Sequence, residues 1–305
     1  MLDCDPGYDD ALAIVLAGLS PCIDIQAITV VAGNQTIEKT TQNALNVCSK
    51  FEMLDIPIAT GMSKPILRKQ VTASGTHGES GLDGLSFEKI KTKLDSLHAV
   101  DLIIKKFMES NGYITLVAIG PLTNIAMAIL MQPAIVSKIG KIVLMGGTCK
   151  MGNVTPSAEF NIFADPEAAH IVFNCGRPIV MVGLDLTHQV IATQKVISRI
   201  KSIKNEASKF FLDIIRNLSK NKREIKELGG PPLHDLAAIA RVIDPSVMET
   251  KPANVAIEIK SEQSYGRTIC DYFGVAKKPA NAEVAIKLHV EKFWNLIYKT
   301  LKDSG

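Results

Sequence analysis

Short runs of β-branched and other apolar residues alternate along this chain with stretches whose apolar side chains recur at helical spacing. The run "IDIQAITVVAG" at 23–33 is followed by "NQTIEKTTQNALNVCSKF", and "YITLVAIG" at 113–120 is followed by "PLTNIAMAILMQP". "KIVLMGG" at 141–147 and "PIVMVGLD" at 178–185 are separated by "DPEAAHIVFN", a predicted helix. Apolar strands that alternate with helices are typical of a parallel sheet covered on both faces. We therefore predict an α/β fold with a mostly parallel central sheet flanked by helices.

The remaining segments add loops, two strands and a terminal helix to this core. Residues 61–95 are predicted to form a polar loop around "ASGTHGESGLDG", and long polar loops in compact domains tend to be functional. An irregular or helical segment at about 190–232 precedes "PPLHDLAAIARVIDP", which begins an apolar helical pattern. "NVAIEI" and "AEVAIKLHV" predict strands, and "FWNLIYKTLK" ends a terminal helix. Since no repeat, linker or low-complexity segment interrupts the chain, we predict one domain over residues 1–305.

The composition excludes several classes of protein. With 47% apolar and 21% charged residues, the chain resembles an ordinary globular protein, and its net charge of +3 over 305 residues is too small to indicate nucleic-acid binding. No apolar run is long enough to cross a membrane, and no signal-peptide pattern opens the chain. The cysteines have no CxxC or zinc-type spacing, so we expect reduced thiols in a cytoplasmic protein. They are Cys4, Cys22, Cys48, Cys149, Cys175 and Cys270.

The first ten residues hold four aspartates beside the apolar segment "ALAIVLAG", namely Asp3, Asp5, Asp9 and Asp10. Clustered carboxylates repel one another, and burying them unpaired costs several kcal/mol or shifts their pKa values. A helix N-terminus would stabilise Asp9 and Asp10 by about 0.3–1 kcal/mol each, but it leaves Asp3 and Asp5 unexplained. A hard cation accounts for more of the cluster. We favour Ca²⁺, which accepts 6–8 oxygens in a flexible shell, over the tighter octahedron of Mg²⁺.

Other polar residues follow the predicted strands at the points where those strands end. Asn34 comes after the strand at 23–33, Gly120 after "LVAI", and the segment 153–161 after "KIVLMGG". Ligands of open parallel sheets bind beyond the carboxyl ends of the strands. We therefore expect these residues and the aspartate cluster to converge in one crevice.

These segments resemble the motif series of the inosine–uridine nucleoside hydrolase family. The matching stretches run in the same order along the chain: "DCDPGYDDALAI", "VVAGNQT", "HGESGLDG", "GPLTNIAMA", "LMGG", "GNVTPSAEFNIFADPEAA", "VGLDLTH" and "PLHD". "YGRTICDYFGV" and "KPANAEVAI" are most similar to the bacterial pyrimidine-preferring members. The resemblance implies the nucleoside hydrolase fold with its Rossmann-like core, and a calcium-dependent enzyme of nucleoside catabolism and pyrimidine salvage. It also implies a homotetramer or homodimer.

The resemblance carries roles onto matching positions. The Ca²⁺ ligands would be the carboxylates of Asp5, Asp10 and Asp235 and the backbone carbonyl of Ile119. The ribose diol would be held by Asp9, Asn34 and Asn161, and the 5′-hydroxyl by Asn153 and Glu159.

The chemistry of N-glycosidic cleavage agrees with these roles. It develops an oxocarbenium-like sugar and a negatively charged base, so the enzyme must supply a nucleophile and neutralise the base. We choose Asp5 as the general base for the attacking water, and we expect His234 or His77 to protonate the leaving base. Phe160 could lie against the ribose or base and Met145 could line the pocket, although core packing is an ordinary role for both.

Two departures from the family pattern bear on activity. Only two residues precede Asp3, where family members carry a longer central strand, so we expect either a truncated start or a sheet that lacks this strand. The stretch "FLDIIRNLSKNKREIKELGG" is basic where pyrimidine-preferring relatives place polar or aromatic side chains that reach the base. Its basic residues include Lys220, Lys222, Arg223 and Lys226.

Two other functions compete with the hydrolase. A non-catalytic nucleoside-binding protein would keep the metal site but lose turnover through the missing strand. A Mg²⁺-dependent phosphotransferase would use an early aspartate of "DCDPG" as nucleophile, but it has no role for the double aspartate or for "AEFN".

Overall fold

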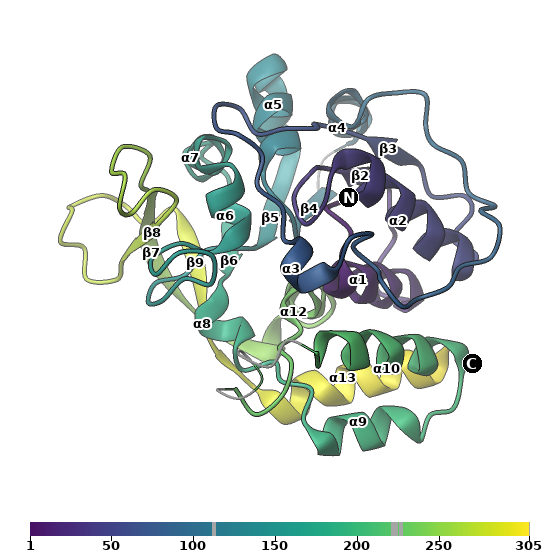
Figure 1. Ribbon diagram of the computed structural model, residues 1–305. Coiled ribbons are helices and arrows are strands. Elements are labelled where there is room, and N and C mark those ends of the chain that lie inside the picture. Colours follow the sequence, from purple (N-terminus) through teal and green to yellow (C-terminus); the bar gives the residue numbers. More distant parts are fainter. Residues whose placement is uncertain (112–113, 221–224, 226–227, 305) are drawn as a thin grey trace.

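The computed structural model describes residues 1–111, 114–220, 225 and 228–304. In this part of the chain one nine-stranded sheet has the order β3-β2-β1-β4-β5-β6-β9-β7-β8 (Figure 1). The pairs from β3 through to β9 are parallel, and β7 runs antiparallel to both β9 and β8. The prediction of a mostly parallel central sheet is confirmed. The strands are β1 (Leu2–Cys4), β2 (Ile28–Val30), β3 (Ile58–Thr60), β4 (Ile114–Ala118), β5 (Ile139–Met145), β6 (Ile179–Val182), β7 (Met248–Ile257), β8 (Thr268–Asp271) and β9 (Ala282–Leu288).

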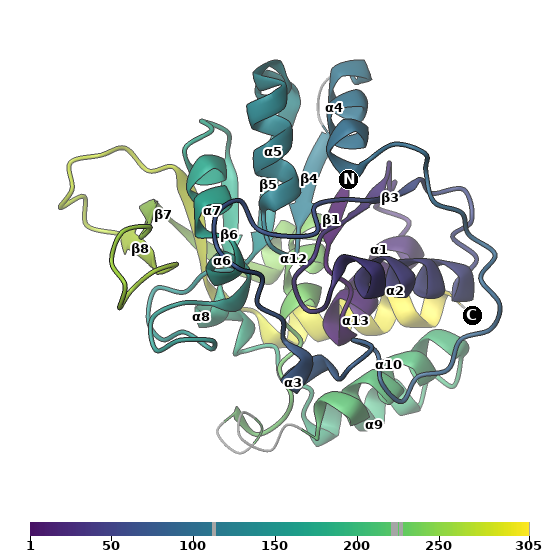
Figure 2. The same ribbon diagram turned by 45° about the horizontal axis from the view of Figure 1, so that its top comes forward.

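Helices cover both faces of the sheet, as Figures 1 and 2 show from two directions. On one face α1 packs against α2, α12 and α13, and on the other α5 packs against α4 and α7. Each face encloses its own apolar core. The helices are α1 (Tyr8–Leu19), α2 (Ile37–Lys50), α3 (Ser74–His77), α4 (Ala99–Glu109), α5 (Thr123–Met131), α6 (Phe160–Ala164), α7 (Pro166–Phe173), α8 (Leu184–Thr187), α9 (Gln194–Lys201), α10 (Glu206–Leu218), α12 (His234–Ile243) and α13 (Val290–Asp303).

The first strand forms although only two residues precede Asp3, so the expectation that the sheet lacks this strand was wrong. β1 is three residues long and lies between β2 and β4, parallel to both. The amide of Val31 donates to the carbonyl of Cys4 and the amide of Ile119 to that of Asp3, each at 2.9 Å. The terminal amine of Met1 also donates to the carbonyl of Thr115 at 3.0 Å. Pairing on both edges compensates for the short length.

Several predicted elements form with altered bounds. The predicted strand 178–185 ends early, because α8 begins at Leu184 directly after β6. The polar loop 61–95 is mostly irregular and contains the short helix α3. The segment 190–232 holds α9 and α10 where it is described. The edge strand β8 was not predicted, since "TICD" is too short to show a pattern. No helix in the described part of the chain combines the length and apolarity that a membrane crossing needs.

Candidate active site

The site lies where the strand order reverses. From β1 the chain proceeds to β2 and β3 on one side of the sheet, and it returns through β4 and β5 on the other side. In such sheets the carboxyl ends of the strands at the reversal form a crevice that binds ligands. Asp5 follows β1 and Ile119 follows β4, so both lie at this point. These two residues are the first of the strand-end residues that were expected to lie close together.

The turn "DPGYDD" folds around the carboxylate of Asp10. The amide of Asp5 donates to Oδ1 of Asp10 at 3.1 Å, and the amide of Gly7 donates to Oδ2 at 3.0 Å. Nδ2 of Asn34 donates to the same Oδ2 at 2.9 Å and to the carbonyl of Asp5 at 3.1 Å. The amide of Asn34 donates to Oδ2 of Asp5 at 2.6 Å. Asp10 therefore caps α1, as a helix N-terminus predicts, while Asn34 joins the turn to the end of β2.

Two glycines make room for the carboxylate of Asp5. A Cβ atom on Gly33 would lie 2.1 Å from Oδ2 of Asp5, and one on Gly120 would lie 2.6 Å from Oδ1. Both distances are shorter than a van der Waals contact, so any larger residue would displace the carboxylate. From its place in the sequence, Gly120 was predicted only to follow the end of a strand.

Asp235 brings a further carboxylate from the C-terminal half of the chain. It lies in the first turn of α12, which packs against α1. One carboxylate oxygen from each of Asp9, Asp10 and Asp235 lies within 4.8 Å of the other two, and all three residues are buried. The structure thus groups Asp9 with Asp10 and Asp235, whereas the resemblance placed Asp5 in that set and Asp9 at the sugar.

The electrostatics of these carboxylates favour a bound cation. Burial, reinforced by the neighbouring Asp9, raises the pKa of Asp10 to about 7. Burial raises the pKa of Asp235 well above its usual range, with further contributions from Asp9 and Asp10. Burial and the adjacent Asp10 likewise raise the pKa of Asp5, whose Oδ1 has no donor within hydrogen-bond distance among the described residues. Carboxylates that repel one another, with one oxygen of Asp5 left without a donor among the described residues, are suited to a hard divalent cation.

Two histidines line a pocket beside the carboxylates. Nδ1 of His77 accepts a hydrogen bond from the amide of Tyr8 at 3.1 Å, which in the neutral ring leaves the proton on Nε2. Burial lowers the pKa of His77, although Asp9 partly opposes the effect. Nδ1 of His234 lies 2.8 Å from Oγ1 of Thr187 at the end of α8. Both histidines and Asp9 line this pocket together with Thr76, Leu218, Ile225, Pro231 and Pro232.

Asn161 connects the ends of two strands on the other side of the crevice. Its Nδ2 donates to the carbonyl of Ile119 at 2.9 Å and to that of Met145 at 3.1 Å. Asn161 therefore contacts the carbonyl that the resemblance assigns to the metal. Met145 itself is buried at the end of β5.

Glu159 and Asn153 organise the loop between β5 and α6. Oε1 of Glu159 accepts from the amide of Asn161 at 2.9 Å, and Oε2 accepts from the amide of Gly147 at 2.9 Å. Burial raises the pKa of Glu159 to about 7 despite these bonds. Oδ1 of Asn153 accepts from the amide of Phe160 at 3.0 Å, and Phe160 is half-buried. Both predicted 5′-hydroxyl ligands thus belong to one loop.

The basic stretch near the predicted base site is only partly described. Lys220 is exposed at the end of α10, while Lys222, Arg223 and Lys226 lie outside the described residues. Their predicted effect on base recognition stays a prediction.

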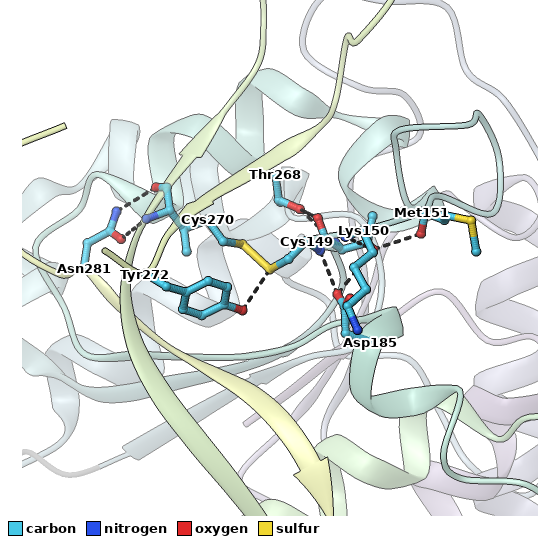
Figure 3. The surroundings of a disulfide bond; sticks show 10 residues. Cys149, Lys150, Met151, Asp185, Thr268, Cys270, Tyr272 and Asn281 are labelled. Carbon is cyan, nitrogen blue, oxygen red and sulfur yellow. Dashed lines mark hydrogen bonds between the residues drawn. A yellow bond between two sulfur atoms is a disulfide. The ribbon is translucent and has the colours of Figure 1, made fainter. Parts of the chain in front are cut away.

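A disulfide joins the loop between β5 and α6 to the edge of the sheet (Figure 3). Cys149 and Cys270 are bonded across a sequence separation of 121 residues, so the expectation of reduced thiols was wrong for this pair. The amide of Cys149 donates to Asp185 at 2.7 Å, and the amide of Thr148 donates to Oγ1 of Thr268 at 2.8 Å. The sequence offered no signal for the pair, because only the pairing of β7 with β8 and β9 brings Cys270 to the loop.

Comparisons with known proteins agree with this geometry. The model of the inosine-uridine preferring nucleoside hydrolase family matches residues 1–295. The pyrimidine-specific ribonucleoside hydrolases RihB of Shigella flexneri and Escherichia coli are each 49% identical over 302 residues, which cover 99% of this chain and 96% of the relative.

Solved structures show the same relationship. The purine-preferring ribonucleoside hydrolase from Gardnerella vaginalis is 32% identical, with a TM-score of 0.92 over 99% of this chain and 98% of its own. An inosine-uridine preferring nucleoside hydrolase from Bacillus anthracis, 22% identical, has the same fold with a TM-score of 0.81 over 99% and 98% of the two chains. The chain therefore belongs to the inosine-uridine preferring nucleoside hydrolase family and is an N-glycosidase.

Proposed function

We propose that this chain hydrolyses the N-glycosidic bond of pyrimidine ribonucleosides, such as uridine and cytidine, with the help of a bound Ca²⁺. The observation that carries the proposal is the cluster of Asp9, Asp10 and Asp235 at the reversal of the strand order, beside two pocket histidines. The amide of Asp5 donates to Asp10 of this cluster. The pyrimidine preference rests on the two relatives at 49% identity, since the purine-preferring structure is only 32% identical.

The proposed cation site consists of Asp5, Asp10, Asp235 and the carbonyl of Ile119. The donor-free Oδ1 of Asp5 and the raised pKa values of the three carboxyl groups support it. When bound, Ca²⁺ would hold the ribose diol and lower the pKa of a coordinated water. Asp9 is close enough to Asp10 and Asp235 to contact the cation as well as the sugar.

The chain's own residues supply the other parts of the mechanism. Asp5 takes a proton from the attacking water through Oδ1, the oxygen without a donor. Asn34 and Asn161 use their Nδ2 groups to bond the protein, which leaves Oδ1 of each to accept from the ribose hydroxyls. The water attacks the face of the sugar opposite the base, as in an inverting glycosidase.

We propose that His234, and not His77, protonates the leaving base. A protonated ring at position 77 would point Nδ1–H at the amide hydrogen of Tyr8, so His77 is held neutral and can only donate from Nε2. Nδ1 of His234 instead meets a hydroxyl, which accepts a hydrogen bond from a protonated ring. His77 would contribute a hydrogen bond to the base from the pocket that it shares with His234.

The expected assembly follows from the resemblance, whereas the expected location came from the cysteine pattern. We expect a cytoplasmic homotetramer or homodimer, although the Cys149–Cys270 disulfide removes the argument from reduced thiols. The reason for considering a non-catalytic binder is weaker, because β1 is present and paired on both edges.

The direct test is ribose release by the purified protein after EDTA treatment and readdition of Ca²⁺. Uridine and cytidine should be cleaved faster than inosine and adenosine, and no phosphate should be released from phosphomonoesters. Asp303→Asn, on the exposed end of α13, is the matched control for the site aspartates. Saturable uridine binding without ribose release would support a nucleoside-binding protein instead.

A further inference from the structure

The last residue of α8 contacts a proposed catalytic side chain. Thr187 is fully buried, and its Oγ1 lies 2.8 Å from Nδ1 of His234. We infer that Thr187 is a positioning residue, which fixes the orientation of the His234 ring at the pocket that this ring lines. This inference rests on the proposed role of His234, and it gives a function to "VGLDLTH", a motif whose threonine had none.

The backbone around the contact holds the two side chains at a fixed separation. The amide of Leu233 donates to the carbonyl of Val190, and the amide of Ala192 donates to that of Pro231, both at 3.0 Å. These bonds pair the segment after α8 with the segment before α12. Thr187 precedes this paired junction and His234 follows it, so the junction keeps the two residues close together.

A hydroxyl can hold a histidine ring through Nδ1 whether or not that nitrogen carries a proton. It accepts from Nδ1–H when the ring is charged, and it rotates to donate when Nδ1 carries no proton. In the proposed step the C1′–N bond breaks, its electron pair stays on the base, and the proton on Nε2 moves to that base. The Thr187–His234 hydrogen bond can persist throughout, because it engages only Nδ1.

The two pocket histidines differ in the group that contacts their Nδ1 atoms. Nδ1 of His77 faces the amide of Tyr8, a group that only donates, whereas Nδ1 of His234 faces a group that donates or accepts. The hydrogen-bond partner of each Nδ1 therefore indicates a different proposed role for each ring. One donates a hydrogen bond, and the other transfers a proton.

The test compares Thr187→Val, which keeps the shape and loses the hydroxyl, with Thr187→Ser, which keeps the hydroxyl. Thr187→Val should lower kcat for uridine by about tenfold to a hundredfold, a part of the typical contribution of general acid catalysis. For a nitrophenyl riboside, whose leaving group needs no proton, the loss should stay below about threefold. Thr187→Ser should recover most of the uridine rate. Thr300→Val, at a buried threonine of α13, is the matched control, and Thr187→Ala replaces the valine variant if that does not fold.

Two further measurements separate positioning from a structural role. In a His234→Ala background, Thr187→Val should cause no additional loss on uridine, since the residues act as one unit. Nuclear magnetic resonance of ¹⁵N-histidine in the cation-free protein should show altered ring-nitrogen signals for His234 in Thr187→Val and none in Thr300→Val. Equal losses on both substrates, additive losses with His234→Ala, or unchanged ring signals would each overturn the inference. A wild-type protein that releases no ribose would overturn the proposed function, while the ring signals would still decide on the hydrogen bond.

Discussion

At the scale of single residues, the site contains carboxylates whose pKa values are raised by burial and by one another. The two oxygens of Asp5 differ, because Oδ2 accepts from the amide of Asn34 while Oδ1 has no donor among the described residues. Asp10 is held differently, with both oxygens accepting from the protein. This difference supports the proposed roles of Asp5 as the general base and Asp10 as a cation ligand.

Asp5→Asn should lower kcat for uridine by about a thousandfold, since removal of a general base typically costs 10²–10⁴. The amide keeps an oxygen for the amide of Asn34, so the fold should persist, as circular dichroism would show. Asp303→Asn should match the wild type. A rate for Asp5→Asn within tenfold of the wild type would exclude Asp5 as the base.

Gly120→Ala should reduce both Ca²⁺ affinity and uridine turnover by at least about tenfold, because its Cβ atom would meet Oδ1 of Asp5 at 2.6 Å. Gly75→Ala is the control, since a Cβ atom there meets nothing within 4 Å. Calorimetric titration with Ca²⁺ measures the first effect and ribose release the second. Wild-type affinity in Gly120→Ala would contradict the placement of Asp5 at the cation.

At the scale of elements, the loop between β5 and α6 is held at several points. Glu159 caps α6 and bonds back to Gly147 at the start of the loop. The disulfide and the Thr148–Thr268 bond fasten the same loop to β8. An edge strand thereby supports the loop that carries both predicted 5′-hydroxyl ligands.

Reduction of the disulfide should lower the free energy of unfolding by about 2–4 kcal/mol, because the bond closes a long loop in the unfolded chain. The Cys149→Ser/Cys270→Ser protein should show the same loss and no response to dithiothreitol, whereas Cys22→Ser, at an exposed free cysteine, should behave as the wild type. Urea unfolding with and without reductant measures this. Equal midpoints for the wild type in both conditions would show that the bond contributes no stability.

At the scale of the whole molecule, folding buries acidic groups that are ionised when unfolded. The folded pKa of Asp10 and of Glu159 is about 7, whereas their ordinary values are 3.8 and 4.5. At pH values between the ordinary and the folded pKa values, the folded, cation-free protein binds more protons than the unfolded chain. Its stability should therefore fall as pH rises through this window. A cation that replaces these protons at the aspartates reverses the trend, since ligands of the folded state stabilise it.

In EDTA, the melting temperature should accordingly decrease from pH 5 to pH 7. The increase on adding Ca²⁺ should be larger at pH 8 than at pH 5, where protons compete for the carboxylates. Differential scanning calorimetry across this range checks both. A Ca²⁺-induced shift that is the same at both pH values would show that the cation does not bind at these groups.

The sequence alone determined the layered α/β arrangement, because apolar periodicity and strand-end polar residues are local properties. It identified Asp10, Asn34 and Asn161 for the same reason, and in the structure Asn34 bonds to Asp10 while Asn161 bonds to the carbonyl of Ile119 at the end of β4. Contacts between segments far apart in the sequence decided the other features of the fold and the site. β1 is stable only between β2 and β4, Cys149 meets Cys270 only through the edge of the sheet, and the partners of His77 and His234 come from other elements. Contacts between segments far apart in the chain leave no periodic pattern in either segment.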